Sequence, residues 1–212
     1  MHPSSIYIIG AQCTGKTTLV HALEETFARE YPSLHFHPIK EVARDVLKQH
    51  HFIRDDITNS PQRALELQQL IMAAQYEAES KAATLPILCD RSGVDPIVYA
   101  VKYGPADAQE TLENSAQWRW LQDRMRRALV IVCPPYQGWL IDDGTRLMAS
   151  NWAEWHDMHL AFIQLLQSNG IAFQVIPSEL LDLEGRAGFV LRLWGEVSGI
   201  TVSDHDGVRQ EQ

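Results

Sequence analysis

Two glycines, a lysine and a threonine near the N-terminus have a spacing that suits phosphate binding, Gly-x4-Gly-Lys-Thr. Gly10 and Gly15 permit backbone angles that a Cβ atom forbids, so the chain can curl and turn several N–H groups toward one anion. Lys16 offers a compact positive charge to the outer phosphates of a nucleotide, and the Thr17 hydroxyl is a ligand for Mg2+. The predicted nucleotide-binding residues are Gly10, Ala11, Gln12, Cys13, Thr14, Gly15, Lys16, Thr17 and Thr18.

The segments on either side of this loop favour the same interpretation. Residues 6–9 read Ile-Tyr-Ile-Ile, a short apolar run typical of a buried strand. Leu19, Leu23 and Phe27 follow at helical spacing, so the positive end of a helix dipole is expected to point at the anion. A turn that binds nothing is the alternative, and the two correct flanks disfavour it.

Asp90 and Arg91 directly follow a second apolar run, residues 86–89. A carboxylate at this place commonly holds Mg2+ or its bound water, opposite the hydroxyl of a phosphate-binding loop. Arg91 adds a planar cation that can grip phosphate or sugar oxygens. The alternative is a structural Asp–Arg pair that caps the helix beginning at Val94. With the loop upstream we favour the functional hypothesis and assign Thr17 and Asp90 to the metal.

Glu41 and Arg44 stand three residues apart after a predicted strand at residues 34–39, so both lie on one helix face. The hypothesis is that Glu41 reaches an acceptor hydroxyl and takes its proton as phosphorus is attacked. The alternative is a solvated ion pair worth a few tenths of a kcal/mol.

Residues 142–146, Asp-Asp-Gly-Thr-Arg, suggest a lid over the site. Arg146 would neutralise charge on the transferring phosphoryl group. Asp142 and Asp143 would hold that arginine or a second ion. An ordinary acidic turn remains the alternative.

The elements that must position these candidates are strands that alternate with helices along the chain. Helices on both faces of a mainly parallel five-stranded sheet are therefore expected, a three-layer α/β sandwich. Ligands bind at the carboxyl ends of such strands, which should gather Gly10, Glu41, Asp90, Pro134 and Ser178 on one rim. Strands are predicted at residues 6–9, 34–39, 86–89, 129–133 and 171–176. Helices are predicted after Thr18 and at 41–50, 61–83, 94–103, 108–127, 151–167 and 183–197, with 51–59 as a polar connection. Ser60 is expected to cap the helix at 61–83, with Pro61 at its first position.

Bulk properties limit the function classes. The 212 residues suit one domain, residues 1–198, followed by a polar tail at 199–212. The net charge of −9 argues against nucleic acid or a basic membrane-docking surface as partner. No apolar run reaches transmembrane length. Three cysteines without a Cys-x-x-Cys pair indicate a reducing compartment, and a cytoplasmic location is expected.

Several other residues have two interpretations. Cys13 is a reactive thiol or a small inert side chain, and inert is favoured. The pairs His35/His37 and His156/His159 lack further ligands for zinc. Trp152 or Trp155 lines an acceptor pocket or only packs helices. Ser178 contacts a nucleotide base or forms a plain turn.

Together these motifs resemble the NadR-type nicotinamide riboside kinase-like P-loop family, often labelled AAA-type ATPase domains. The resemblance rests on residues 10–18, on 41–44, on Asp90-Arg91-Ser92 with Asp95 and Tyr99, and on Asp142-Asp143-Gly144 with Arg146. It implies a nucleoside-kinase-like P-loop NTPase fold that binds ATP or GTP with Mg2+. The implied catalytic residues are Lys16, Glu41, Asp90, Arg91 and Arg146. The implied substrate-binding residues are Glu41, Arg44, Arg91 and Asp95.

The chain departs from this family in two ways. The bacterial enzymes usually bear another catalytic domain, for which 212 residues leave no room. Nothing beyond the loop identifies nicotinamide as the substrate.

Two functions follow from the sequence. The first is a Mg-dependent kinase that phosphorylates a small nucleoside-like acceptor. The second is a nucleotide-dependent binding module that reports ATP or GTP to a partner. A Ras-like switch is disfavoured because residues 133–136, Cys-Pro-Pro-Tyr, follow the fourth strand and no Asn-Lys-x-Asp segment is present.

Overall fold

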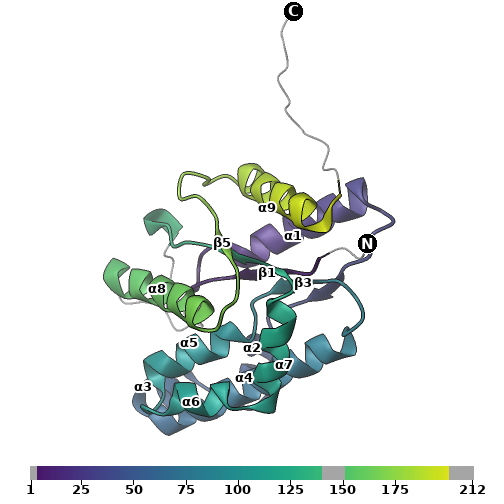
Figure 1. The fold of residues 1–212 in the computed structure, drawn as a ribbon. Coiled ribbons are helices and arrows are strands. Elements are labelled where there is room, and N and C mark those ends of the chain that lie inside the picture. Colours follow the sequence, from purple (N-terminus) through teal and green to yellow (C-terminus); the bar gives the residue numbers. More distant parts are fainter. Residues whose placement is uncertain (1–3, 140–150, 201–212) are drawn as a thin grey trace, which may run out of the picture.

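A computed structural model describes residues 4–139 and 151–200 (Figure 1). The predicted lid residues Asp142, Asp143 and Arg146 and the predicted tail from residue 201 onward lie outside the described residues. The strands are β1 Ile6–Ile9, β2 His37–Ile39, β3 Ile87–Asp90, β4 Leu129–Val132 and β5 Gln174–Val175. The helices are α1 Lys16–Glu30, α2 Ala43–Gln49, α3 Arg54–Asn59, α4 Pro61–Lys81, α5 Val94–Tyr103, α6 Ala108–Glu113, α7 Ala116–Met125, α8 Trp152–Ser168 and α9 Leu183–Ser198, with a 3-10 turn η1 at Gln137–Trp139.

The five strands form one sheet in the order β2-β3-β1-β4-β5, and every neighbouring pair is parallel. Parallel neighbours require crossover connections, and helices supply them. The predicted five-stranded α/β sandwich is therefore confirmed. The carboxyl end of β1, which precedes the loop, lies beside the carboxyl end of β3, whose last residue is Asp90, and Ile8 is opposite Asp90.

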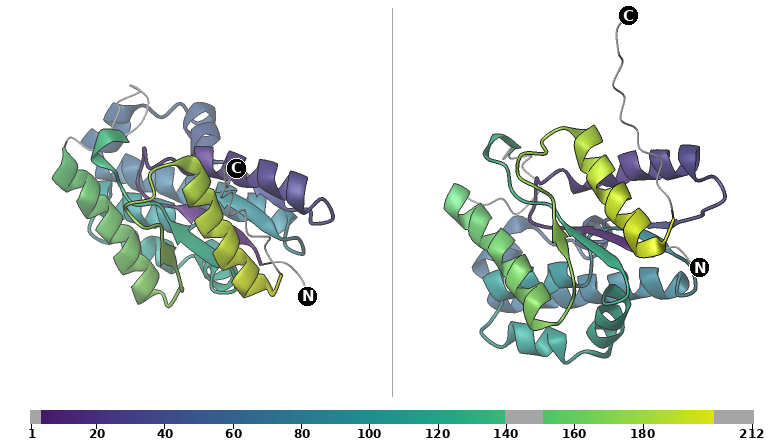
Figure 2. Two further views of the ribbon diagram at one scale, coloured as in Figure 1. Left: turned by 90° about the horizontal axis from the view of Figure 1, so that it is seen from above. Right: turned by 45° about the horizontal axis from the view of Figure 1, so that its top comes forward.

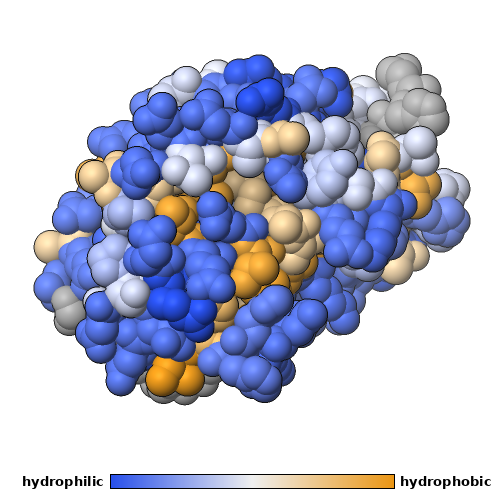
Figure 3. All heavy atoms as spheres, turned by 90° about the horizontal axis from the view of Figure 1, so that it is seen from below, coloured by the Kyte–Doolittle hydropathy of each residue, from blue (hydrophilic) through white to orange (hydrophobic). Residues whose placement is uncertain are grey.

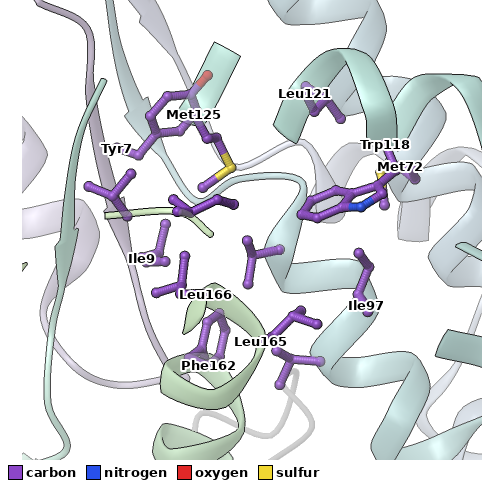
Figure 4. Packing of buried hydrophobic residues seen from close by; sticks show 14 of the residues in the cluster. Tyr7, Ile9, Met72, Ile97, Trp118, Leu121, Met125, Phe162, Leu165 and Leu166 are labelled. Carbon is purple, nitrogen blue, oxygen red and sulfur yellow. The ribbon is translucent and has the colours of Figure 1, made fainter. Parts of the chain in front are cut away.

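Side chains of β1 alternate between two apolar layers, as the pleat of a strand requires. Ile6 and Ile8 pack with buried residues of α1 and α9. Tyr7 and Ile9 pack on the other face with residues of α4, α5, α7 and α8. Figure 4 shows this second layer, in which Trp118 and Phe162 lie among aliphatic side chains. The sheet is thus covered on both faces and holds the rim of strand ends in place.

The helices pack in two groups, which Figure 2 shows from two further directions. Helices α1 and α9 lie next to each other on one face of the sheet. On the other face α4 contacts α2, α3, α5 and α7, and α5 contacts α8. The outer surface of this helical layer is mainly hydrophilic, with a strip of apolar side chains across its middle (Figure 3). In the described part of the chain, no helix is both long and apolar enough to cross a bilayer.

Two sequence-based boundaries were wrong. Residues 51–59 were expected to be a polar connection, but α3 forms there because the Asp56 carboxylate accepts a hydrogen bond from the Ile53 N–H at 3.0 Å, and Ile57 is buried. Residues 108–127 were expected to be one helix. The chain instead starts a new helix at Ser115, whose hydroxyl accepts the N–H of Trp118 at 3.1 Å.

The remaining elements keep their predicted order, and the bounds of most of them shift by only a few residues. The second and fifth strands pair over only three and two residues. Ser60 caps α4 as predicted, since its hydroxyl accepts the N–H of Arg63 at 3.3 Å and Pro61 occupies the first helical position.

Candidate functional site

The loop between β1 and α1 adopts a conformation that depends on its glycines. Gly10 has a φ of 133° and Gly15 a φ of 73°. A Cβ on Gly10 would stand 2.5 Å from the backbone oxygen of Cys133, the residue after β4, so there is no space for a side chain at position 10. The spacing of the two glycines therefore has the structural reason that the sequence suggested.

Lys16 is folded into this loop and is 5% exposed. Its Nζ donates hydrogen bonds to the carbonyl oxygen of Ala11 at 2.5 Å and to the Thr14 hydroxyl at 3.3 Å. No carboxylate of the described residues forms an ion pair with it. Burial, together with the nearby Arg91 cation, lowers the pKa of Lys16 to about 8. The loop therefore carries a positive charge that no nearby carboxylate neutralises directly.

The structure brings Thr17 and Asp90 together. The Thr17 hydroxyl donates to Oδ2 of Asp90 at 2.6 Å. The other carboxylate oxygen, Oδ1, is buried and has no hydrogen-bond partner within the described part of the chain. An unsatisfied buried carboxylate oxygen is costly. A hydroxyl and a carboxylate are oxygen ligands of the kind that Mg2+ prefers, so this pair fits a divalent cation.

Glu41 and Arg91 form the next part of the rim, across β3 from the loop. Nε of Arg91 lies 2.6 Å from Oε1 of Glu41, and Nε of Arg44 lies 2.8 Å from Oε2. Burial by itself would raise the pKa of Glu41, but Arg91 and Arg44 outweigh it and lower the pKa to about 2. The alternative of a wholly solvated pair is wrong for Glu41, whose side chain is 13% exposed, although Arg44 is half exposed.

Arg91 is held from a second side by Asp95. Its Nη1 lies 3.0 Å from Oδ1 of Asp95, while Oδ2 of Asp95 accepts the N–H of Ser92 at 2.9 Å and its hydroxyl at 3.1 Å. Burial raises the pKa of Asp95, against the lowering effect of Arg91 and Lys16. Arg91 itself has a left-handed φ of 83°. The guanidinium is therefore fixed between two carboxylates.

Gln12 connects the loop to α5 and α8. The Tyr99 hydroxyl donates to its side-chain oxygen at 3.0 Å, and the indole N–H of Trp155 donates to its carbonyl at 2.8 Å. Trp155 is fully buried, which favours a packing role. Trp152 is 40% exposed and meets Trp155 edge-on, with ring centres 5.9 Å apart.

A cavity lies beside the loop, between the segments that follow β4 and β5. Sequence reasoning missed two of its residues, Trp139 and Arg186, because an aromatic in a loop and an arginine in a helix carry no motif. Ser178, predicted to stand near a base, belongs to this cavity. The lining residues are Pro134, Pro135, Tyr136, Trp139, Ile176, Pro177, Ser178, Leu180, Leu181 and Arg186.

The remaining candidates include the histidine pair of α8 and the cysteines. The rings of His156 and His159 have centres 6.1 Å apart, and burial lowers the pKa of His159. Among the described residues no three His, Cys, Asp or Glu side chains form a metal cluster. Cys13 is half-buried in the loop, and none of the three cysteines is in a disulfide.

The sequence matches a known family over most of its length, because a family model described as AAA domain covers residues 5–183. The chain belongs to this AAA domain family. No curated protein matches it closely enough to count as a relative.

Solved structures show the same fold. The NadR protein in complex with NR has a TM-score of 0.73 at 22% identity, over 96% of this chain and 54% of that one. The complex of NadR with NAD and AMP-PNP gives 0.70 at 19%, over 95% and 51%. The chain thus spans about half the length of NadR. Deoxyadenosine kinase from M. mycoides with bound dATP gives 0.58 at 15%, over 90% and 98%. The family model confirms the predicted AAA domain label, and these structures confirm the predicted NadR-like, nucleoside-kinase-like fold.

Proposed function

We propose that this protein is a Mg-dependent phosphotransferase that moves the terminal phosphoryl group of ATP or GTP to a nucleoside-like acceptor. The contact between Thr17 and Asp90, next to the buried Lys16, carries the proposal. The fold supports it, because similar structures include a kinase that binds dATP and a NadR protein that binds NR or AMP-PNP. A cytoplasmic location agrees with the absence of disulfides.

The donor nucleotide occupies the loop of residues 10–18 in this proposal. Lys16 and the N–H groups of the loop bind its phosphates, and the buried charge of Lys16 makes an anion favourable there. The base enters the neighbouring cavity, whose walls of Pro135, Pro177 and Trp139 offer flat apolar contact. Ser178 supplies a polar group at the edge of this cavity.

Thr17 and Asp90 would hold Mg2+, either directly or through water. When bound, the ion neutralises charge on the phosphates as phosphorus is attacked. The unsatisfied Oδ1 of Asp90 is the observation that favours this assignment.

The acceptor lies toward Glu41, Arg91, Asp95 and Arg44. A carboxylate with a pKa of about 2 is a weak base, so Glu41 serves mainly to accept a hydrogen bond from the acceptor hydroxyl and orient it. The transition state of phosphoryl transfer is loose, so the group that faces the acceptor hydroxyl need not be a strong base before the bond to phosphorus forms. Arg91 stabilises negative charge on the transferring group. Arg146 from the predicted lid is proposed to add to this charge.

The alternative is a nucleotide-dependent binding module without transfer activity. One observation favours it: two ion pairs already occupy both oxygens of Glu41.

One experiment separates the two functions. Purified protein is mixed with Mg2+, ATP or GTP and a panel of nucleosides that includes nicotinamide riboside and deoxyadenosine, and ADP or GDP release is followed. The kinase account predicts release that depends on one acceptor, its loss in Lys16→Ala, and nucleotide binding without transfer in Glu41→Gln. Binding by the wild type with no acceptor-dependent turnover would favour the binding module. Undiminished turnover in Glu41→Gln would remove Glu41 from the mechanism.

A further inference from the structure

The C-terminal helix α9 carries an arginine that is buried against the phosphate-binding loop. Arg186 is 3% exposed, and its Nη2 donates to the carbonyl oxygen of Thr14 at 2.9 Å. Its guanidinium carbon lies 5.0 Å from the ring centre of Trp139. Nη1 lies beside Gly15, only 2.6 Å from where a Cβ on that glycine would stand. Gly15 therefore permits this close approach, in addition to adopting its left-handed φ of 73°.

The charge of Arg186 is not neutralised locally. Among the described residues no carboxylate forms an ion pair with it, and the same holds for Lys16 of the loop itself. A buried cation costs free energy unless an anion lies close to it. Two such cations, Lys16 within the loop and Arg186 packed against it, indicate a ligand that carries more negative charge than is needed to neutralise Lys16 alone.

The position of the guanidinium indicates which part of the ligand it meets. Arg186 contacts the loop through Thr14, and it also lines the apolar cavity together with Trp139 and Pro177. It thus lies where the phosphates and the base of one nucleotide would join. Trp139 holds the planar cation by a cation–π contact, which orients the side chain in advance.

We propose that Arg186 is a nucleotide-binding residue, whose positive charge binds the phosphate chain of the donor where it enters the cavity. This rests on the proposed nucleotide site but requires no phosphoryl transfer. The simpler alternative is that Arg186 only ties α9 to the loop through the Thr14 hydrogen bond.

Two substitutions separate charge from hydrogen bonding. Arg186→Gln keeps an N–H donor for Thr14 but removes the charge, and Arg186→Lys keeps the charge without the planar fork. Arg192→Gln is the matched control, because Arg192 lies on the same helix, is 57% exposed and pairs with Glu196 at 2.9 Å. The dissociation constants of Mg-ATP and of inorganic tripolyphosphate are measured by calorimetry. The thermal midpoint of each protein is measured without ligand.

We expect Arg186→Gln to bind both probes about tenfold more weakly or worse, since a hydrogen bond to a charged group contributes about 1.5 kcal/mol or more. Arg186→Lys should retain most of the affinity, and Arg192→Gln should match the wild type. Equal affinity in Arg186→Gln and the wild type would overturn the proposal. A similar loss of affinity in Arg186→Gln and Arg186→Lys, accompanied by a lowered thermal midpoint in both, would also overturn it. That pattern would mean that Arg186 only holds α9 against the loop.

Failure of the kinase proposal is distinguishable from failure of this one. A wild type that binds Mg-ATP but phosphorylates nothing refutes the kinase and leaves the Arg186 comparison intact. A wild type that binds neither probe refutes both.

Discussion

The ion pairs of Glu41 allow a quantitative test of the rim. Glu41→Gln removes one negative charge between Arg91 and Arg44 while keeping the shape of the side chain. The pKa of Glu41 falls from the ordinary 4.5 to about 2, because the two arginines outweigh burial. At about 1.4 kcal/mol for each pH unit, the charged form stabilises the fold by up to about 3 kcal/mol at neutral pH. That figure agrees in size with the cost of breaking a buried pair, about 3 to 5 kcal/mol.

The sign of the pH dependence follows from the lowered pKa. The folded state holds its proton less tightly than the unfolded state, so the stabilisation is fully present above pH 4.5. It disappears as the pH falls from 4.5 toward 2. The free energy of unfolding of wild type and Glu41→Gln should therefore differ by up to about 3 kcal/mol at pH 7, and this difference should shrink steadily as the pH falls below 4.5 toward 2.

Urea unfolding at a series of pH values from 7 to 3 provides the measurement. Glu66→Gln is the control, because Glu66 pairs with Arg63 at 2.6 Å but is half exposed, so its loss should cost less than about 1 kcal/mol. A Glu41→Gln difference that equals the Glu66→Gln difference, or that does not change with pH, would refute the reasoning.

Three further predictions follow from the loop and its supports. Gly10→Ala should destabilise the protein by about 1 to 3 kcal/mol, because the φ of 133° at this position and the 2.5 Å approach to Cys133 exclude a methyl group. An unchanged urea midpoint would contradict this. Mg-ATP affinity should fall as the pH rises above about 8, because Lys16 loses its proton there in the free protein. Calorimetry from pH 7.5 to 9.5, in buffers of different ionisation enthalpy, should also detect proton uptake on binding. Constant affinity over this range would count against the role of Lys16. Trp155→Phe keeps an aromatic side chain but removes the indole N–H that the Gln12 carbonyl accepts and part of a fully buried ring. Thermal unfolding should therefore show a loss of at least about 1 to 3 kcal/mol, and full stability would mean that this hydrogen bond is dispensable.

The sequence was sufficient for the central strands and the loop because each of these depends on local pattern. The run at residues 6–9 is apolar at every position since both faces of β1 are covered, and the glycines are required by their own φ angles. The rule that strand ends meet at one rim then predicts that Asp90 lies opposite Thr17.

Other features depend on contacts that the sequence does not reveal. The helix α3 was missed because its polar residues suggested a connection, whereas the Asp56 cap and the burial of Ile57 stabilise it. Arg186 lies 172 residues from Thr14 in the chain, and an arginine in a helix usually faces solvent. Only the packing of α9 against α1 brings it to the loop.

The most direct test of the account is a crystal structure of the protein with AMP-PNP and Mn2+, in which anomalous scattering locates the metal. We predict that the phosphates lie in the loop of residues 10–18 within reach of Lys16. We also predict that Mn2+ contacts the Thr17 hydroxyl, with Asp90 bound to the metal or to its water. Phosphates bound elsewhere, or a metal distant from both side chains, would contradict the central claim.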